Sequence, residues 1–363
     1  MKISGYLKTV RGIHIAAATD KNSTGIASEP VLDMQTGRTQ RVPFIPATVL
    51  RGKLRRIASD IADEQMIKHG VRITIEVFNA LRHGSHSGRM TNDPVAPSFF
   101  NAQKGHPIMG LFGGGPRQGA GGALRTAPAY PLCAETLAAG LVPHDMAVET
   151  PPQAFVLTHE AFMYPRLDVM READPSFDTV IENLDEKIDE IICADVARRA
   201  KKETGGEDDG PESTLRGSNL LSYRYMIPGV MLHLDMKVDP RTPDHLKGFL
   251  LLALLRLLNS NEIGGMQRIG IGTDTFDLAS AAAKIQIDGE QAFEWNGHEL
   301  TFAHGGEAAR LYAAYEAWND DGKAWTNASL WDATGFTGID MDKAAVKKTP
   351  KKAPKKDPKK GDQ

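Results

Sequence analysis

The chain has 363 residues, of which 41% are hydrophobic and 25% charged, with a formal net charge of −3. This length suits one large domain with insertions or two smaller ones. Its two cysteines, Cys133 and Cys193, exclude a disulfide-stabilised scaffold and favour a reducing compartment. Residues 1–18 carry polar side chains throughout, and no apolar run is long enough to span a bilayer, so we expect a cytoplasmic protein without a signal peptide.

The charge is unevenly distributed along the chain. Residues 172–213 carry 14 acidic and 5 basic side chains, whereas residues 343–363 carry 9 lysines and 2 aspartates. Because local potential governs phosphate binding, the slightly negative total does not exclude a nucleic-acid ligand.

The first strong element is a basic helix that follows Pro46. Thr48 is predicted to cap it, and Leu50, Leu54, Ile57 and Ile61 recur at helical spacing and predict one buried face. We expect the basic side chains to occupy the remaining surface; these are Arg51, Lys53, Arg55 and Arg56. A helix N-terminus with basic side chains beside it favours phosphate, and Gly52 leaves room for another backbone. An amphipathic helix with a solvated basic face is the alternative.

Glycines dominate the next segment, which reads Leu111-Phe112-Gly113 and then Gly114 to Gly119. No Gly-Lys-Ser/Thr follows, so we do not expect nucleotide hydrolysis. Further along, residues 180–200 have a helical pattern and residues 204–211 are acidic and glycine-rich. We interpret residues 172–213 as an insertion.

The second half of the chain repeats the order of strand, helix and loop. Residues 223–238 predict two strands around Pro228-Gly229, and a helix opens near Asp244 and ends at 259–261. The glycine-rich segment GGMQRIGIG at 264–272 then exposes N–H groups beside Arg268 and leads to a predicted strand at 273–278. A tight helix-to-strand turn is the alternative for this loop.

The C-terminal part predicts a hairpin at 283–302 with a type I′ turn at Asn296-Gly297, then a helix at 308–318 with Trp325 and Trp331 packed beneath it. The lysine- and proline-rich residues 343–363 predict a disordered tail. This tail either adds nonspecific affinity for nucleic acid or only aids solubility.

These motifs together resemble the RAMP superfamily of CRISPR-associated RNA-binding proteins, and more narrowly the repeating backbone subunit of multi-subunit effectors. The family's IPGSSLKGKLR helix is matched by IPATVLRGKLR at 45–55, its LFG by 111–113, and its GG…RG(Y/F)G loop by 264–272. Residues 3–5 and 12–15 resemble its first strand and the GLHIG segment that ends it.

The resemblance implies an α/β (α+β) fold with an RRM-like, ferredoxin-type βαββαβ core, a thumb hairpin and a helical insertion. The first part of the core would span residues 1–154, the thumb and insertion 155–225, and the second part 226–342, before the tail at 343–363. The residues expected on the thumb are Phe155, Phe162, Met163, Tyr164 and Arg166. Core packing is an equal alternative for Phe162 and Tyr164.

The resemblance further implies a non-catalytic function. Several copies would oligomerise head-to-tail along a guide RNA, together with other effector subunits, and present it for base pairing with a target DNA or RNA. The RNA-binding residues would come from the basic helix, the two glycine-rich loops and the thumb; they are His14, Thr48, Arg51, Lys53, Arg55, Arg117, Arg125, Phe162, Arg166, Gly265, Met266, Gln267 and Arg268.

The expected absence of catalysis rests on one loop. RNA-cleaving members carry an aspartate before an NPV-like segment, whereas this chain has Ser28 before Glu29-Pro30-Val31. The length, the missing carboxylate and the family-like first half together resemble type IV backbone subunits best. A shifted register with Glu29, or His14 acting as a base, would instead give a ribonuclease that processes guide RNA or cleaves target RNA. A third interpretation, based on the lysine-rich tail, is a general single-strand nucleic-acid-binding protein.

We expect no metal site and no cofactor, because His83 and His86 have no cysteines at a zinc-ligand spacing.

Overall fold

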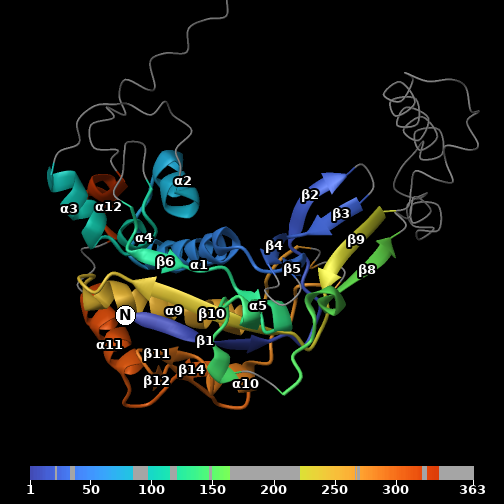
Figure 1. The fold of residues 1–363 in the computed structure, drawn as a ribbon. Helices are drawn as coiled ribbons and strands as arrows, with labels where there is room; N and C mark the ends of the chain where they lie inside the picture. Colours follow the sequence, from blue (N-terminus) through green and yellow to red (C-terminus); the bar gives the residue numbers. More distant parts are fainter. Residues whose placement is uncertain are drawn as a thin grey trace, which may run out of the picture.

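The computed structural model describes residues 1–20, 23–32, 37–84, 97–114, 121–146, 149–163, 221–265, 267, 270–320 and 325–334. They form a mixed α/β fold around one central antiparallel sheet (Figure 1).

The central sheet has the strand order of a ferredoxin-like core. β1 (Lys2–Lys8) leads to α1 (Ala47–Lys68), β6 (Leu124–Thr126), β10 (Met231–Val238), α9 (Asp244–Ser260) and β11 (Gln286–Ile287). The order in the sheet is β11-β1-β10-β6, and every pairing is antiparallel. This is a βαββαβ unit with its fourth strand beside its first and its third beside its second, as expected. β12 (Glu290–Gln291) and β7 (Tyr130–Pro131) extend the sheet.

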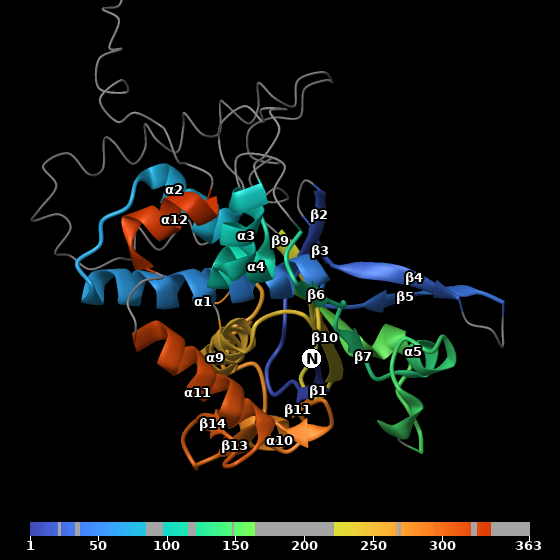
Figure 2. The ribbon, with the colours of Figure 1, turned by 90° about the vertical axis from the view of Figure 1, so that its left-hand side faces the viewer.

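Helices α1 and α9 cover one face of this sheet (Figure 2). Ile3 and Leu7 of β1, and Leu234 of β10, are buried in the same core as Leu54 of α1. The apolar side chains that alternate along the strands and those at helical spacing in α1 and α9 therefore pack together in one apolar layer. α11 (Glu307–Asp320) packs so closely on α9 that a Cβ at Gly248 would lie 2.0 Å from the Leu311 oxygen.

The other face of the sheet is partly covered by α5 (Ala134–Ala138). Tyr6 of β1 is buried with Leu132, Leu137 and Val142 in a small separate cluster. Two 3-10 turns follow, His144–Met146 and Ala154–Leu157.

A second sheet extends from one end of the core, on the right of Figure 1. Its strand order is β2 (Ala16–Asp20), β3 (Ser23–Ile26), β9 (Leu221–Met226) and β8 (Thr158–Met163). β8 and β9 pair antiparallel over six residues each, at the two ends of the expected thumb. The acidic insertion and its expected helix at 180–200 lie outside the described residues. β4 (Ser28–Leu32) and β5 (Thr39–Pro43) form a separate ribbon.

A helical group lies beside the start of α9 and includes α2 (Ile75–His83), α3 (Pro97–Gly105), α4 (Pro107–Phe112) and α12 (Asn327–Thr334). Trp325 is fully buried among these helices, contacts Phe249 of α9 and donates from Nε1 to Asn319. Its predicted packing beneath the helix of 308–318 is confirmed, since it also contacts Trp318. The side chain of Trp331 and the tail at 343–363 are not among the described parts.

Two local predictions were wrong. Residues 273–278 form one isolated bridge, Thr9 to Phe276, because α10 (Leu278–Ala282) begins immediately afterwards. The hairpin of β13 (Phe293–Trp295) and β14 (Leu300–Phe302) has a four-residue loop closed by Asn296, in which Gly297 has positive φ and Asn296 does not. The two successive positive-φ residues typical of a type I′ turn are Asp288 and Gly289, between β11 and β12.

Candidate nucleic-acid interface

The start of α1 is open. Pro46, not Thr48, is the cap residue, and no side chain caps this end, so the predicted Thr48 cap was wrong. Thr48 is instead an exposed residue of the first turn. The N–H groups of Val49 and Leu50 bond to the Pro46 oxygen, whereas those of Ala47 and Thr48 have no acceptor among the described residues. Two N–H groups and the positive end of a 22-residue helix are therefore available to an anion.

Arg51 and Arg55 do not belong to an exposed basic surface, and that prediction was wrong. Arg51 donates to the carbonyls of Leu124 and Phe112 at 2.6 and 2.7 Å. Arg55 is only 7% exposed and donates to three carbonyls, those of Leu81, Gly113 and Ala80, at 2.6 to 2.7 Å. Burial and the neighbouring charge of Arg51 lower the pKa of Arg55 to about 10. These guanidiniums satisfy carbonyls at the ends of α2, α4 and β6, since arginine offers five fixed donors and no acceptor.

Lys53 lies on another side of α1 and connects it to the glycine loop. Its Nζ lies 3.6 Å from an Oε2 of Glu262, and 25% of its side chain remains exposed. Arg56 is exposed. Of the four basic side chains predicted on this helix, Lys53 and Arg56 therefore retain access to solvent.

The glycine loop is held by close backbone contacts. Gly265 donates to the His14 oxygen at 2.8 Å and Gly272 donates to the Gly12 oxygen at 2.9 Å. Gly264 has φ of 89°, and a Cβ there would lie 2.5 Å from the His14 oxygen. Only glycine allows this approach. Gly265 is exposed and Gln267 is half-buried, while Met266 and Arg268 lie outside the described residues.

His14 occupies the junction between this loop and the second sheet. It is 2% exposed, and its Nδ1 lies 2.8 Å from the Arg224 carbonyl oxygen. Because a carbonyl only accepts, Nδ1 carries the proton and donates. Tyr223 packs edge-on against the imidazole ring. The side chain of His14 therefore fixes this segment to β9, while its main-chain oxygen accepts from Gly265 of the loop.

A short ladder of backbone bonds connects the loop with the start of α1. Beside His14, the Ile15 oxygen accepts from Ala27, and the Ala27 oxygen accepts from Phe44, two residues before the Pro46 cap. The two motifs are about two hundred positions apart in sequence, yet they are linked through residues 14, 15, 27 and 44.

Aromatic side chains gather on the second sheet. Tyr223 and Tyr225 of β9 lie with ring centroids 6.0 Å apart, and His159 of β8 packs edge-on against Tyr225. Phe155, just before β8, is 67% exposed. Such rings are suitable for stacking on unpaired bases. Phe162 lies in β8, but its side chain, like Arg117 and Arg166, is outside the described set.

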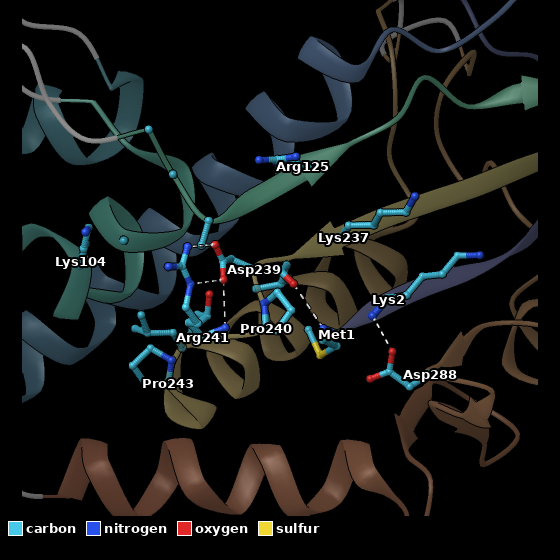
Figure 3. A pocket seen from close by; sticks show the side chains of 17 residues that line it. Met1, Lys2, Lys104, Arg125, Lys237, Asp239, Pro240, Arg241, Pro243 and Asp288 are labelled. Atoms are coloured by element: carbon cyan, nitrogen blue, oxygen red, sulfur yellow. Dashed lines mark hydrogen bonds and ion pairs between the residues drawn. The ribbon is translucent and has the colours of Figure 1, made fainter.

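Arg125 does not join this group. It lies exposed on β6, toward the opposite end of the central sheet from the glycine loop, and faces the cavity shown in Figure 3. The pairing of β6 with β10 determines which end of the sheet it occupies.

The position expected to carry a catalytic acid is occupied by a structural serine. Ser28 begins β4, and its Oγ and carbonyl oxygen accept from Arg41, each at 3.1 Å. Glu29 accepts a hydrogen bond from the Tyr130 hydroxyl.

Within the described ranges no three His, Cys, Asp or Glu side chains are grouped as metal ligands would be. No described helix has both the length and the apolar character needed to cross a membrane.

No protein-family model and no curated protein matches the chain. A chain from a solved structure described as "Type IV-B CRISPR Complex" is similar over 75% of this chain and 88% of its own length, with 15% identity and a TM-score of 0.47. A similarity at this level assigns neither a family nor a function.

Proposed function

We propose that this protein is a guide-RNA-binding backbone subunit of a type IV-like CRISPR effector. Its copies would assemble head-to-tail along the RNA and leave base recognition to pairing with a target. The observation that carries the proposal is the backbone ladder from Gly265 through His14 and Ala27 to Phe44. It joins the two motifs of the family resemblance into one site on a ferredoxin-like core.

The chemistry of this site suits a phosphate backbone. The free N–H groups of Ala47 and Thr48 offer donors, while the N–H of the exposed Gly265 already donates to His14 and its lack of a side chain leaves room for a phosphate to approach. Lys53 and Arg56 add positive charge along α1, and Phe155 and the tyrosines of β9 offer stacking surfaces. Arg51 and Arg55 contribute by fixing α1 against α2 and α4, and we assign them no phosphate contact.

Binding without cleavage is the form of the proposal that the residues support. Ser28 cannot hold a metal as a carboxylate does, and both Ser28 and Glu29 already have hydrogen-bond partners. His14 directs its Nδ1 proton to a carbonyl and is buried, a geometry suited to a positioning role.

A single substitution at the start of α1 tests the site. Thr48→Glu places a carboxylate in the first turn, where it stabilises the helix by interacting favourably with the helix dipole but repels phosphate. We expect at least a tenfold weaker affinity for single-stranded RNA of any sequence, with an unchanged or higher melting temperature. Thr48→Gln is the matched neutral control and should bind like the unmodified protein.

Assembly is tested by coexpression with the guide locus, followed by native mass spectrometry and extraction of bound nucleic acid. A series of large assemblies with a discrete RNA of tens of nucleotides is expected. A nucleic-acid-free monomer that shortens labelled RNA would replace the proposal with the ribonuclease alternative.

A further inference from the structure

A cavity of about 820 Å³ opens at the end of the central sheet where β1 begins and β10 ends (Figure 3). Its walls come from β1, β6 and β10, from the turn at 239–243 that leads into α9, and from α3 and α4. The candidate interface described above follows the opposite end of β1, so the two features are separated by the length of the strand.

A row of basic side chains crosses three adjacent strands at this cavity. Lys2 of β1 is the direct partner of Lys237 of β10, and Lys237 is the direct partner of Arg125 of β6. Direct partners in antiparallel strands point to the same face, and all three side chains are exposed and line the cavity (Figure 3). Like charges directly opposite one another destabilise a sheet, so this row has an energetic cost in the free protein.

Within the described chain no acid forms an ion pair with the row, although Asp239 lies near enough to Arg125 for that charge to help lower the pKa of Asp239. Lys2, Arg125 and Lys237 form no salt bridge there, and neither does Lys104, which lines the same cavity. The two carboxylates that line the cavity, those of Asp239 and Asp288, already accept hydrogen bonds from neighbouring groups.

Asp239 forms two hydrogen bonds with the Arg241 guanidinium and a third with its N–H, and this partner lowers the pKa of Asp239 to about 2. Asp288 accepts from the Lys2 N–H at 2.7 Å. Counting all lining side chains, five are basic and two acidic, so the cavity has an excess of positive charge.

The rest of the lining selects phosphate over base. Among the described residues that line the cavity there is no aromatic side chain on which a base could stack, and several are glycine, alanine or proline. Gly122 is required in the wall, because a Cβ there would lie 2.2 Å from the Leu111 oxygen. Three cations on neighbouring strands span about 10 Å, at roughly 4.8 Å per strand spacing. That length exceeds one phosphate group and suits successive phosphates of a strand.

We propose that this cavity is a second binding site, specific for the phosphodiester backbone of a single-stranded nucleic acid and indifferent to its sequence. It is distinct from the site at α1 and the glycine loop, and it does not depend on the guide-RNA proposal. A protein with both sites holds nucleic acid at the two ends of its central sheet.

The test uses the full chain and fluorescence anisotropy with labelled 12-nucleotide oligo(U) and oligo(dT). The row variant combines Lys2→Gln, Arg125→Gln and Lys237→Gln. The control variant combines Lys68→Gln, Arg72→Gln and Lys284→Gln, which removes the same charge at positions outside the cavity.

For the row variant we expect at least a tenfold weaker affinity and a slope of log K against log salt that is smaller by about 2, at roughly 0.7 per lost phosphate contact. The control variant should keep the slope of the unmodified protein. Equal losses in the two variants would show only a general charge effect and would overturn the proposal.

Thermal unfolding without ligand separates binding from folding. Relief of like-charge repulsion should leave the row variant as stable as the unmodified protein or more stable. A lower melting temperature would mean that the row is structural and would contradict the proposal. Competition with inorganic phosphate and with UMP tests for a smaller ligand. If either competes as strongly per phosphate group as the oligonucleotides do, the cavity binds a free phosphate ligand instead of a strand.

Comparison with Thr48→Glu distinguishes the two proposals. If the row variant loses affinity and Thr48→Glu does not, the cavity site stands and the guide-RNA site fails. If only Thr48→Glu loses affinity, the cavity proposal fails and the guide-RNA site stands.

Discussion

The main-chain N–H of Gly265 donates to the main-chain oxygen of His14 at 2.8 Å, and this bond fixes the glycine loop against the segment that follows β1. The preceding residue, Gly264, lies so close that its α-carbon has no space for a side chain. The close approach of the loop to His14 therefore depends on the absence of a side chain at Gly264.

Gly264→Ala is expected to destabilise the protein by about 1–3 kcal/mol, because it adds a steric clash to a positive φ of 89°. Gly270→Ala is the control, since Gly270 has φ of 80° but nothing within 4 Å of its Cβ position. Urea unfolding of both variants checks this prediction. Equal losses would mean that backbone conformation alone accounts for the effect.

Arg55→Lys is expected to cost about 2–4 kcal/mol of unfolding free energy. Lysine cannot reach the carbonyls of Leu81, Ala80 and Gly113 together, so buried acceptors lose their partners. Arg56→Lys, an exposed neighbour, should change stability by less than about 0.5 kcal/mol. RNA binding measured well below the melting temperature should be unchanged for Arg55→Lys. A stable variant that had lost RNA binding would instead show that Arg55 contacts phosphate.

His106 predicts a specific pH dependence. Complete burial and the nearby Arg55 lower its pKa to about 3, and its Nδ1 accepts from the Met109 N–H at the start of α4. Because the unfolded chain binds this proton near pH 6.5 and the folded chain does not, the stabilisation is complete above pH 6.5. It is lost as pH falls toward 3, by up to about 1.4 kcal/mol per pH unit.

The check is His106→Asn, which retains a side-chain acceptor but does not titrate. Its unfolding free energy should fall less steeply between pH 6.5 and 4 than that of the unmodified protein. Since His233 and His245 also have lowered pKa values from burial, some slope will remain in the variant. Identical slopes would show that His106 is protonated in the folded state.

Glu29→Gln tests the remaining acid near the position expected to be catalytic. Its carboxylate accepts from Tyr130, whose pKa is raised by burial and by this carboxylate. We expect both the variant and the unmodified protein to bind RNA and to leave labelled RNA intact, with or without Mg²⁺. Tyr130→Phe should lower stability by about 1 kcal/mol through the lost hydrogen bond. Cleavage by the unmodified protein that disappears in Glu29→Gln would establish the ribonuclease alternative.

The amino-acid sequence by itself determined several of the main elements and their order. The apolar spacing of Leu50, Leu54 and Ile61 predicted α1, and the two strands around Pro228-Gly229 and the helix from Asp244 are confirmed. These signals are local: burial of one face imposes its period on the residues nearby, so they can be read without knowing what the element contacts.

Tertiary structure alone decided which basic side chains remain available. Arg51, Lys53 and Arg55 are equivalent charges in sequence, yet two satisfy buried carbonyls and one pairs with Glu262. Likewise nothing in the sequence distinguishes Lys2, Arg125 or Lys237 from other basic residues, and only the register of three strands places them in one row. The reason is physical: a cation's partner is set by distance in space, and folding brings together groups that chain order keeps far apart.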